Sequence, residues 1–234
     1  MKACSFCIPP QYIHYNCAFR SKMEIIRIVI EVVRLLNVVT TEECQYQEDT
    51  DENSIQLTIA IDKMSRVFIS EKNKIHSFSF PFTLQAEEEH FNVLHNGADI
   101  SCAICSVLAA IFHDLSDEDS LENILERYWT TVSDLDVSTT DAYLVDRLIT
   151  LLCSFEPGYL RFDHDESEPI RLTRECHPIN HLDINYSTSG TYKFGLDCEL
   201  SAGELLDILN INKPCCFLGE MPACTTLRHV KDTK

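Results

Sequence analysis

Polar and apolar residues alternate in three short segments of the chain, at residues 159–165, 181–186 and 191–196. A period of two residues is typical of half-buried β-strands, in which alternate side chains lie on the same face of a sheet. The pattern therefore predicts three strands with an apolar face and a polar face. The side chains expected together on the polar face are Arg161, Asp163, Asp165, His181, Asp183, Asn185 and Lys193.

Earlier segments carry both helix and strand patterns. Residues 22–37 form an apolar stretch with helical spacing, and Ser21 to Glu24 has the Ser-x-x-Glu pattern of a capping box. Alternation at 55–61, an apolar run at 67–69 and alternating phenylalanines at 78–82 predict an antiparallel meander.

The middle of the chain has helical character. Helices are predicted at 85–95, 98–113, 118–133 and 139–155, and a second capping-box pattern at Ser201 predicts a short helix near the end. The order of helix, meander, helices and sheet favours an α+β fold over a regular βαβ alternation.

The first 22 residues have no clear period and are expected to be an unstructured leader before a single α+β domain at 23–234. Within this leader, Cys4, Cys7, His14 and Cys17 are the ligand types of a small zinc knuckle, although their spacing matches no common one. An unstructured segment is the alternative interpretation.

Composition limits the classes of function. The chain is 45% hydrophobic, and its longest apolar stretch is interrupted by Arg27, Glu31 and Arg34, so no membrane span of about 20 residues is expected. The opening residues lack the apolar core of a signal peptide, so a cytoplasmic location is expected. Most of the 12 cysteines are then expected to be reduced and buried as small hydrophobic residues.

The net charge of −18 argues against broad binding to a nucleic-acid backbone, which requires clustered Lys and Arg. Half of this charge lies at residues 114–146, which contain ten acidic residues and one basic residue, Arg127. Two interpretations stay open: a solvated helix surface, or a docking surface for a basic protein partner.

The polar face of the C-terminal strands is the best candidate for chemistry. Asp163, Asp165, His181 and Asp183 combine carboxylates and an imidazole, which are ligands for divalent ions such as Mg²⁺, Mn²⁺ or Zn²⁺. His177 adds a second imidazole that could act in acid–base catalysis.

Two basic residues share the predicted polar face. Arg161 and Lys193 would hold an anionic substrate beside the metal. The catalytic hypothesis is therefore metal-assisted phosphodiester hydrolysis by a nuclease or nucleotide phosphodiesterase. The competing explanation is structural, because salt bridges such as Arg161 with Asp183 account for the same residues without catalysis. A non-catalytic acidic module that binds a basic partner is the alternative function.

One segment carries a family resemblance. The run Gly-Tyr-Leu-Arg-Phe-Asp-His-Asp from Gly158, followed by His177-Pro178, His181 and a capped apolar helix, resembles an uncharacterised bacterial domain-of-unknown-function family, number 2290, over residues 158–210. The resemblance implies a bacterial cytosolic protein, with a defence or toxin effector role conceivable, and brings no activity with it.

Overall fold

A computed structural model gives the structure of most of the chain. It describes residues 2–8, 19, 21–40, 55–61, 65–87, 90–166, 178–187 and 190–214. Within these residues the fold is α+β, as the order of elements predicts.

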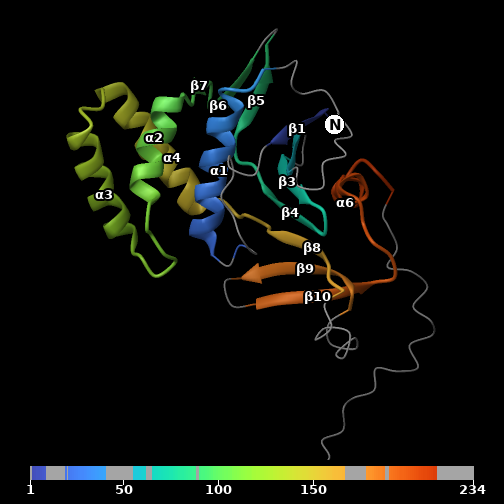
Figure 1. The fold of residues 1–234 in the computed structure, drawn as a ribbon. Helices are drawn as coiled ribbons and strands as arrows, with labels where there is room; N and C mark the ends of the chain where they lie inside the picture. The colour runs from blue at the N-terminus through green and yellow to red at the C-terminus, as the bar shows by residue number, and fades with distance from the viewer. Residues whose placement is uncertain are drawn as a thin grey trace, which may run out of the picture.

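A seven-stranded antiparallel sheet forms the centre of the fold (Figure 1). Its spatial order is β1 (Lys2–Ile8), β2 (Ile55–Ile61), β3 (Arg66–Glu71), β4 (Lys74–Ser79), β8 (Leu160–His164), β9 (Asn180–Ser187) and β10 (Gly190–Leu196). The predicted meander is confirmed as β2, β3 and β4, and the three C-terminal strands extend the sheet through the pairing of β4 with β8. One continuous sheet therefore joins the two halves of the chain.

Residues 2–8 correct the prediction of an unstructured leader. They form β1, which pairs with β2 along its whole length and buries Phe6 and Ile8. Cys4 packs partly buried against the main core, whereas Cys7 is exposed on the opposite face of the strand. This placement argues against a zinc ion held by both cysteines. His14 and Cys17, the other proposed knuckle ligands, lie outside the described residues.

Helices cover one face of the sheet (Figure 1). Nearest to it is α1 (Lys22–Leu36), which begins at the predicted capping box: Ser21 Oγ accepts from Glu24 N, and a Glu24 carboxylate oxygen accepts from Ser21 N. Beyond it lie α2 (Cys102–Phe112) and α4 (Thr139–Ser154), with α3 (Leu121–Asp134) outermost. The predictions at 98–113, 118–133 and 139–155 are thus confirmed, with shifted ends.

The prediction of a helix at residues 85–95 is wrong. This region contains β5 (Thr83–Ala86) and β6 (Phe91–His95), which with β7 (Ala98–Asp99) form a second, three-stranded sheet. The turn between β6 and β7 is Asn96-Gly97, and both residues have positive φ angles, as a tight hairpin turn requires. That Asn-Gly pair was the available sequence signal.

The opposite face of the main sheet is covered by α6 (Ala202–Leu209), which begins at the predicted Ser201–Glu204 capping box. Its Leu205 is fully buried against Phe68, Ile75 and Phe162. This second cluster is separate from the larger core under α1. The C-terminal strands are therefore packed against α6 on their apolar side, and their polar side lies on the opposite face of the sheet.

Cysteine burial differs from the prediction. Cys105 is buried, and burial raises the pKa of its thiol to about 12. Cys102 and Cys198, in contrast, carry exposed free thiols, so the small-hydrophobe role does not hold for them. Across the described helices, none is both long enough and apolar enough to cross a bilayer.

Candidate metal centre

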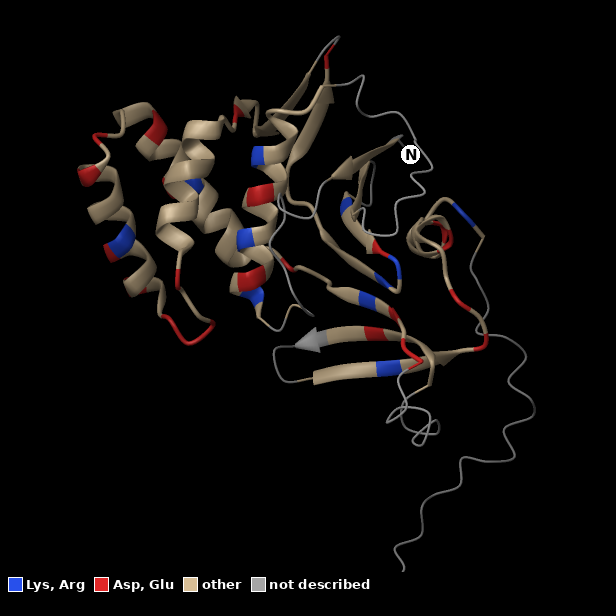
Figure 2. Cartoon of the chain, viewed as in Figure 1, with Lys and Arg blue, Asp and Glu red and all other residues tan. Residues whose placement is uncertain are grey.

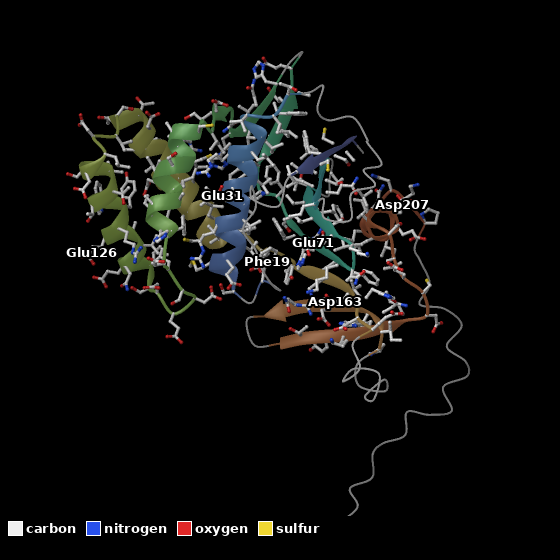
Figure 3. The ribbon with its side chains drawn as sticks, viewed as in Figure 1. Phe19, Glu31, Glu71, Glu126, Asp163 and Asp207 are labelled. Atoms are coloured by element: carbon white, nitrogen blue, oxygen red, sulfur yellow. The ribbon has the colours of Figure 1, made fainter. Side chains whose placement is uncertain are left out.

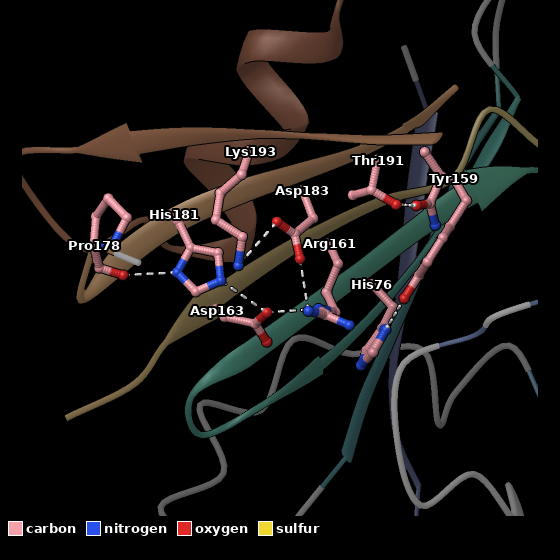
Figure 4. Close-up of polar contacts among 10 residues, drawn as sticks. His76, Tyr159, Arg161, Asp163, Pro178, His181, Asp183, Thr191 and Lys193 are labelled. Carbon is pink, nitrogen blue, oxygen red and sulfur yellow. Dashed lines mark hydrogen bonds and ion pairs between the residues drawn. The ribbon is translucent and has the colours of Figure 1, made fainter. Parts of the chain in front are cut away.

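The strand register brings the predicted polar residues together on β8, β9 and β10. Arg161 pairs with Asp183, Asp163 pairs with His181, and Lys193 pairs with Asp183. Because the three strands are antiparallel and adjacent, these side chains point to the same face, and Figure 4 shows them converging. The alternation in the sequence thus predicted their shared face correctly.

Arg161 bridges the two carboxylates. Its Nε lies 2.6 Å from Asp163 Oδ2, and its Nη2 lies 2.6 Å from Asp183 Oδ2. Desolvation acts to lower the pKa of Arg161, but the nearby charges, with Asp163 foremost, outweigh it and the pKa is raised. The guanidinium therefore stays charged and fixes the spacing between the carboxylates.

His181 has a defined orientation. Its Nδ1 lies 2.8 Å from the carbonyl oxygen of Pro178, which can only accept, so Nδ1 carries the hydrogen. The Nε2 atom lies 3.3 Å from Asp163 Oδ2. Donation from one ring nitrogen to a backbone carbonyl is common among metal-binding histidines, in which the other nitrogen ligates the ion.

Gly195 makes room for this arrangement. It lies opposite His181 in the register of β9 and β10, and a Cβ atom at this position would come within 2.7 Å of Pro178 Cγ. The missing side chain lets Pro178 pack across the strand, where its carbonyl meets His181.

Three side chains form a compact ligand set. One ligand atom from each of Asp163, His181 and Asp183 lies within 4.8 Å of the others, and these residues are only 5%, 1% and 7% exposed. Asp163 Oδ1 is buried and has no hydrogen-bond partner among the described residues. A buried carboxylate oxygen without a donor is costly, and a cation would satisfy it.

Charges in the cluster balance without a metal. Arg161 and Lys193 offset Asp163 and Asp183, with Lys193 Nζ lying 3.4 Å from Asp183 Oδ1. The salt bridge expected between Arg161 and Asp183 is present. A divalent ion at Asp183 would compete with Lys193, whose side chain is partly exposed on the edge strand β10.

Two of the remaining predicted residues, Asp165 and Asn185, lie within the described part of the chain but outside the ligand set. His177 lies outside the described residues. Asp165 follows β8 and is not part of the ligand set, while Asn185 accepts a hydrogen bond from Thr191 at 2.5 Å. Arg161 uses Nε and Nη2 for the carboxylates, so those two atoms do not face a substrate.

His76 was missed by the sequence analysis. It lies on β4 opposite Arg161, is 1% exposed, and its Nδ1 lies 2.8 Å from the Tyr159 hydroxyl. Burial, followed by the charges of Arg161 and Lys74, lowers the pKa of His76 to about 3. It is therefore a neutral core histidine at the border of the site. Along β4 it lies on the same face of the sheet as Phe78.

Comparisons of the chain with protein-family models, with curated proteins and with solved structures found no match. The resemblance over residues 158–210 therefore stays a prediction.

Proposed function

We propose that Asp163, His181 and Asp183 bind a divalent metal ion and that the protein is a metal-dependent phosphodiesterase. The observation that carries the proposal is the buried ligand set on β8 and β9, with its atoms within 4.8 Å of one another. One imidazole and two carboxylates suit Zn²⁺ or Mn²⁺, and three protein ligands leave positions open for water or substrate.

A metal ion held there would polarise a phosphoryl oxygen and lower the pKa of a bound water. The protein residues supply the surrounding electrostatics. Arg161 acts as a positioning residue, since it holds both carboxylates at 2.6 Å. Lys193, once released from Asp183, provides a positive charge for a phosphate at the partly exposed edge of the site.

Overall charge favours a small substrate. A chain with a net charge of −18 repels long polyanions, whereas a mononucleotide-sized phosphodiester requires only a local positive group. A nucleotide phosphodiesterase therefore fits better than a nuclease acting on long strands.

Metal binding tests the ligand set directly. Calorimetric titration with Zn²⁺ and with Mn²⁺ should show one site in the wild-type protein, and Asp163→Asn should weaken it by at least roughly 10-fold. The matched control is Asp165→Asn, which removes an acid two residues away that is not part of the set. Equal loss in both variants, or no binding in the wild type, contradicts the proposal.

Hydrolysis is tested separately with bis(4-nitrophenyl) phosphate. The metal-loaded wild type should release nitrophenolate, and Asp163→Asn should not, while circular dichroism confirms that both are folded. Metal binding without hydrolysis would leave the metal site in place and show that the phosphodiesterase assignment is wrong.

A further inference from the structure

We infer that the outer face of α3 is a docking surface for a basic amphipathic segment of another protein. This surface consists of an apolar stripe, Leu121, Leu125 and Trp129, and a neighbouring acidic stripe, Glu122 and Glu126. It is independent of the proposed metal site: Figure 3 shows Glu126 on α3 and Asp163 on β8 well apart.

The apolar stripe follows from helical spacing. Leu121, Leu125 and Trp129 are four residues apart, so they lie one above another along α3 over about 12 Å. Their exposed fractions are 58%, 36% and 67%. The inner face of the same helix is already used, because Ile124 and Tyr128 are buried.

Packing explains why no other described element covers this face. The helix α3 contacts α2 and lies farthest from the main sheet (Figure 1). Tyr128 also donates to the carbonyl of Ala142 at 3.0 Å, which ties the inner side of α3 to the start of α4. The chain thus places its only tryptophan on the outside of its outermost helix. An exposed tryptophan beside leucines is typical of binding surfaces.

Charge identifies the kind of partner. Glu122 and Glu126 are four residues apart and flank the apolar stripe. Acidic residues dominate this part of the chain (Figure 2), since residues 114–146 contain ten acids and one base. That base, Arg127, donates to the carbonyl of His113 at the end of α2. A partner with apolar anchors flanked by Lys or Arg matches both stripes.

The test uses a model peptide as the probe. The probe is an 18-residue peptide of leucine and lysine with helical amphipathic spacing, labelled with fluorescein so that anisotropy reports binding. The control is an analogue in which glutamate replaces every lysine. The leucine–lysine peptide should bind and shift the emission of Trp129 to the blue, because binding buries the indole. The glutamate analogue should do neither.

A matched pair of variants separates docking from general attraction to an acidic protein. Glu122→Gln with Glu126→Gln should weaken peptide binding by roughly 2- to 30-fold, as expected for the loss of two exposed charge pairs. Asp197→Asn with Glu199→Gln removes the same net charge from an exposed loop after β10, near the opposite end of the molecule. This control should change the dissociation constant by less than about 2-fold.

Several results would overturn the inference. These are no peptide binding, equal binding of the glutamate analogue, equal weakening by the two double variants, or an unchanged Trp129 emission. A blue shift that grows with protein concentration in the absence of peptide would instead identify a second copy of this chain as the occupant.

Discussion

His76 links the stability of the fold to pH. It is buried on β4 next to Tyr159 and Phe19, and its pKa is lowered to about 3, chiefly by desolvation. In the unfolded chain a histidine has a pKa of about 6.5. Between these two values the unfolded state binds a proton that the folded state does not, so the folded state loses stability as the pH falls.

The size of this loss follows from the two pKa values. At pH 7 the unfolded histidine is mostly neutral, whereas at pH 5 it is almost fully protonated and the folded one is still neutral. Proton linkage then removes about 2 kcal/mol of unfolding free energy between pH 7 and pH 5 through His76 alone. Other titrating groups add their own contributions, so the quantity to compare is a difference between variants.

His76→Asn isolates this contribution. Asparagine keeps a polar atom near the position of Nδ1 and has no proton to gain, so the variant should lose about 2 kcal/mol less than the wild type between pH 7 and pH 5. It should also be less stable at pH 7, by roughly 1–3 kcal/mol, because the smaller side chain leaves a cavity. Urea unfolding followed by circular dichroism at both pH values measures these quantities.

Tyr159→Phe is the control, since it removes the hydroxyl that contacts His76 but keeps the ring and the burial. Its pH dependence should match the wild type, because desolvation is the largest cause of the shift. If His76→Asn and the wild type lose the same free energy between pH 7 and pH 5, the argument is refuted.

Three further predictions address the site and the first helix. Lys193→Gln should raise the affinity for Zn²⁺ or Mn²⁺ by roughly 2- to 5-fold, because it removes a positive charge 3.4 Å from Asp183; calorimetry measures this. Gly195→Ala should lower the free energy of unfolding by about 1–3 kcal/mol, because its methyl group would overlap Pro178; urea unfolding measures it. Ser21→Ala should cost about 1 kcal/mol of stability in the same assay, since it removes the cap of α1.

Opposite results would be informative for each of these variants. Weaker metal binding in Lys193→Gln would show that the lysine supports the site and does not compete with the ion. An unchanged stability of Gly195→Ala would mean that Pro178 can move away without cost. An unchanged stability of Ser21→Ala would mean that Asp117 is enough to cap this helix end, since its carboxylate accepts from the amides of Lys22 and Met23.

Period-two alternation made the C-terminal strands predictable. Each of β8, β9 and β10 has one apolar side and one polar side, so the face shared by Arg161, Asp163, His181, Asp183 and Lys193 followed from the sequence. The registers that set atom distances did not follow, because they depend on strand pairing. The sequence therefore predicted a polar face, while the 4.8 Å ligand set required the structure.

Other elements lacked a decisive local signal. The strand β1 gains its stability from pairing with β2, a partner distant in the sequence, so its own composition resembled a leader. The segment 85–95 is too short and mixed to separate helix from strand by period alone. His76 was overlooked because a histidine in an apolar strand shows its burial only after the sheet is assembled.

The pairing of β4 with β8 has a consequence for the kinetics of folding. Ile75 pairs with Phe162 across a long intervening stretch that contains the small sheet and the helices α2, α3 and α4. Closing so long a loop carries a large entropic cost, which slows folding. The hairpin of β9 and β10 forms from neighbours in sequence and can assemble early, but it joins the rest of the sheet only after this closure. Substitutions at the apolar pair of Ile75 and Phe162, which lies on the other face of the sheet from the ligand set, should thus change how fast the protein folds more than they change metal binding.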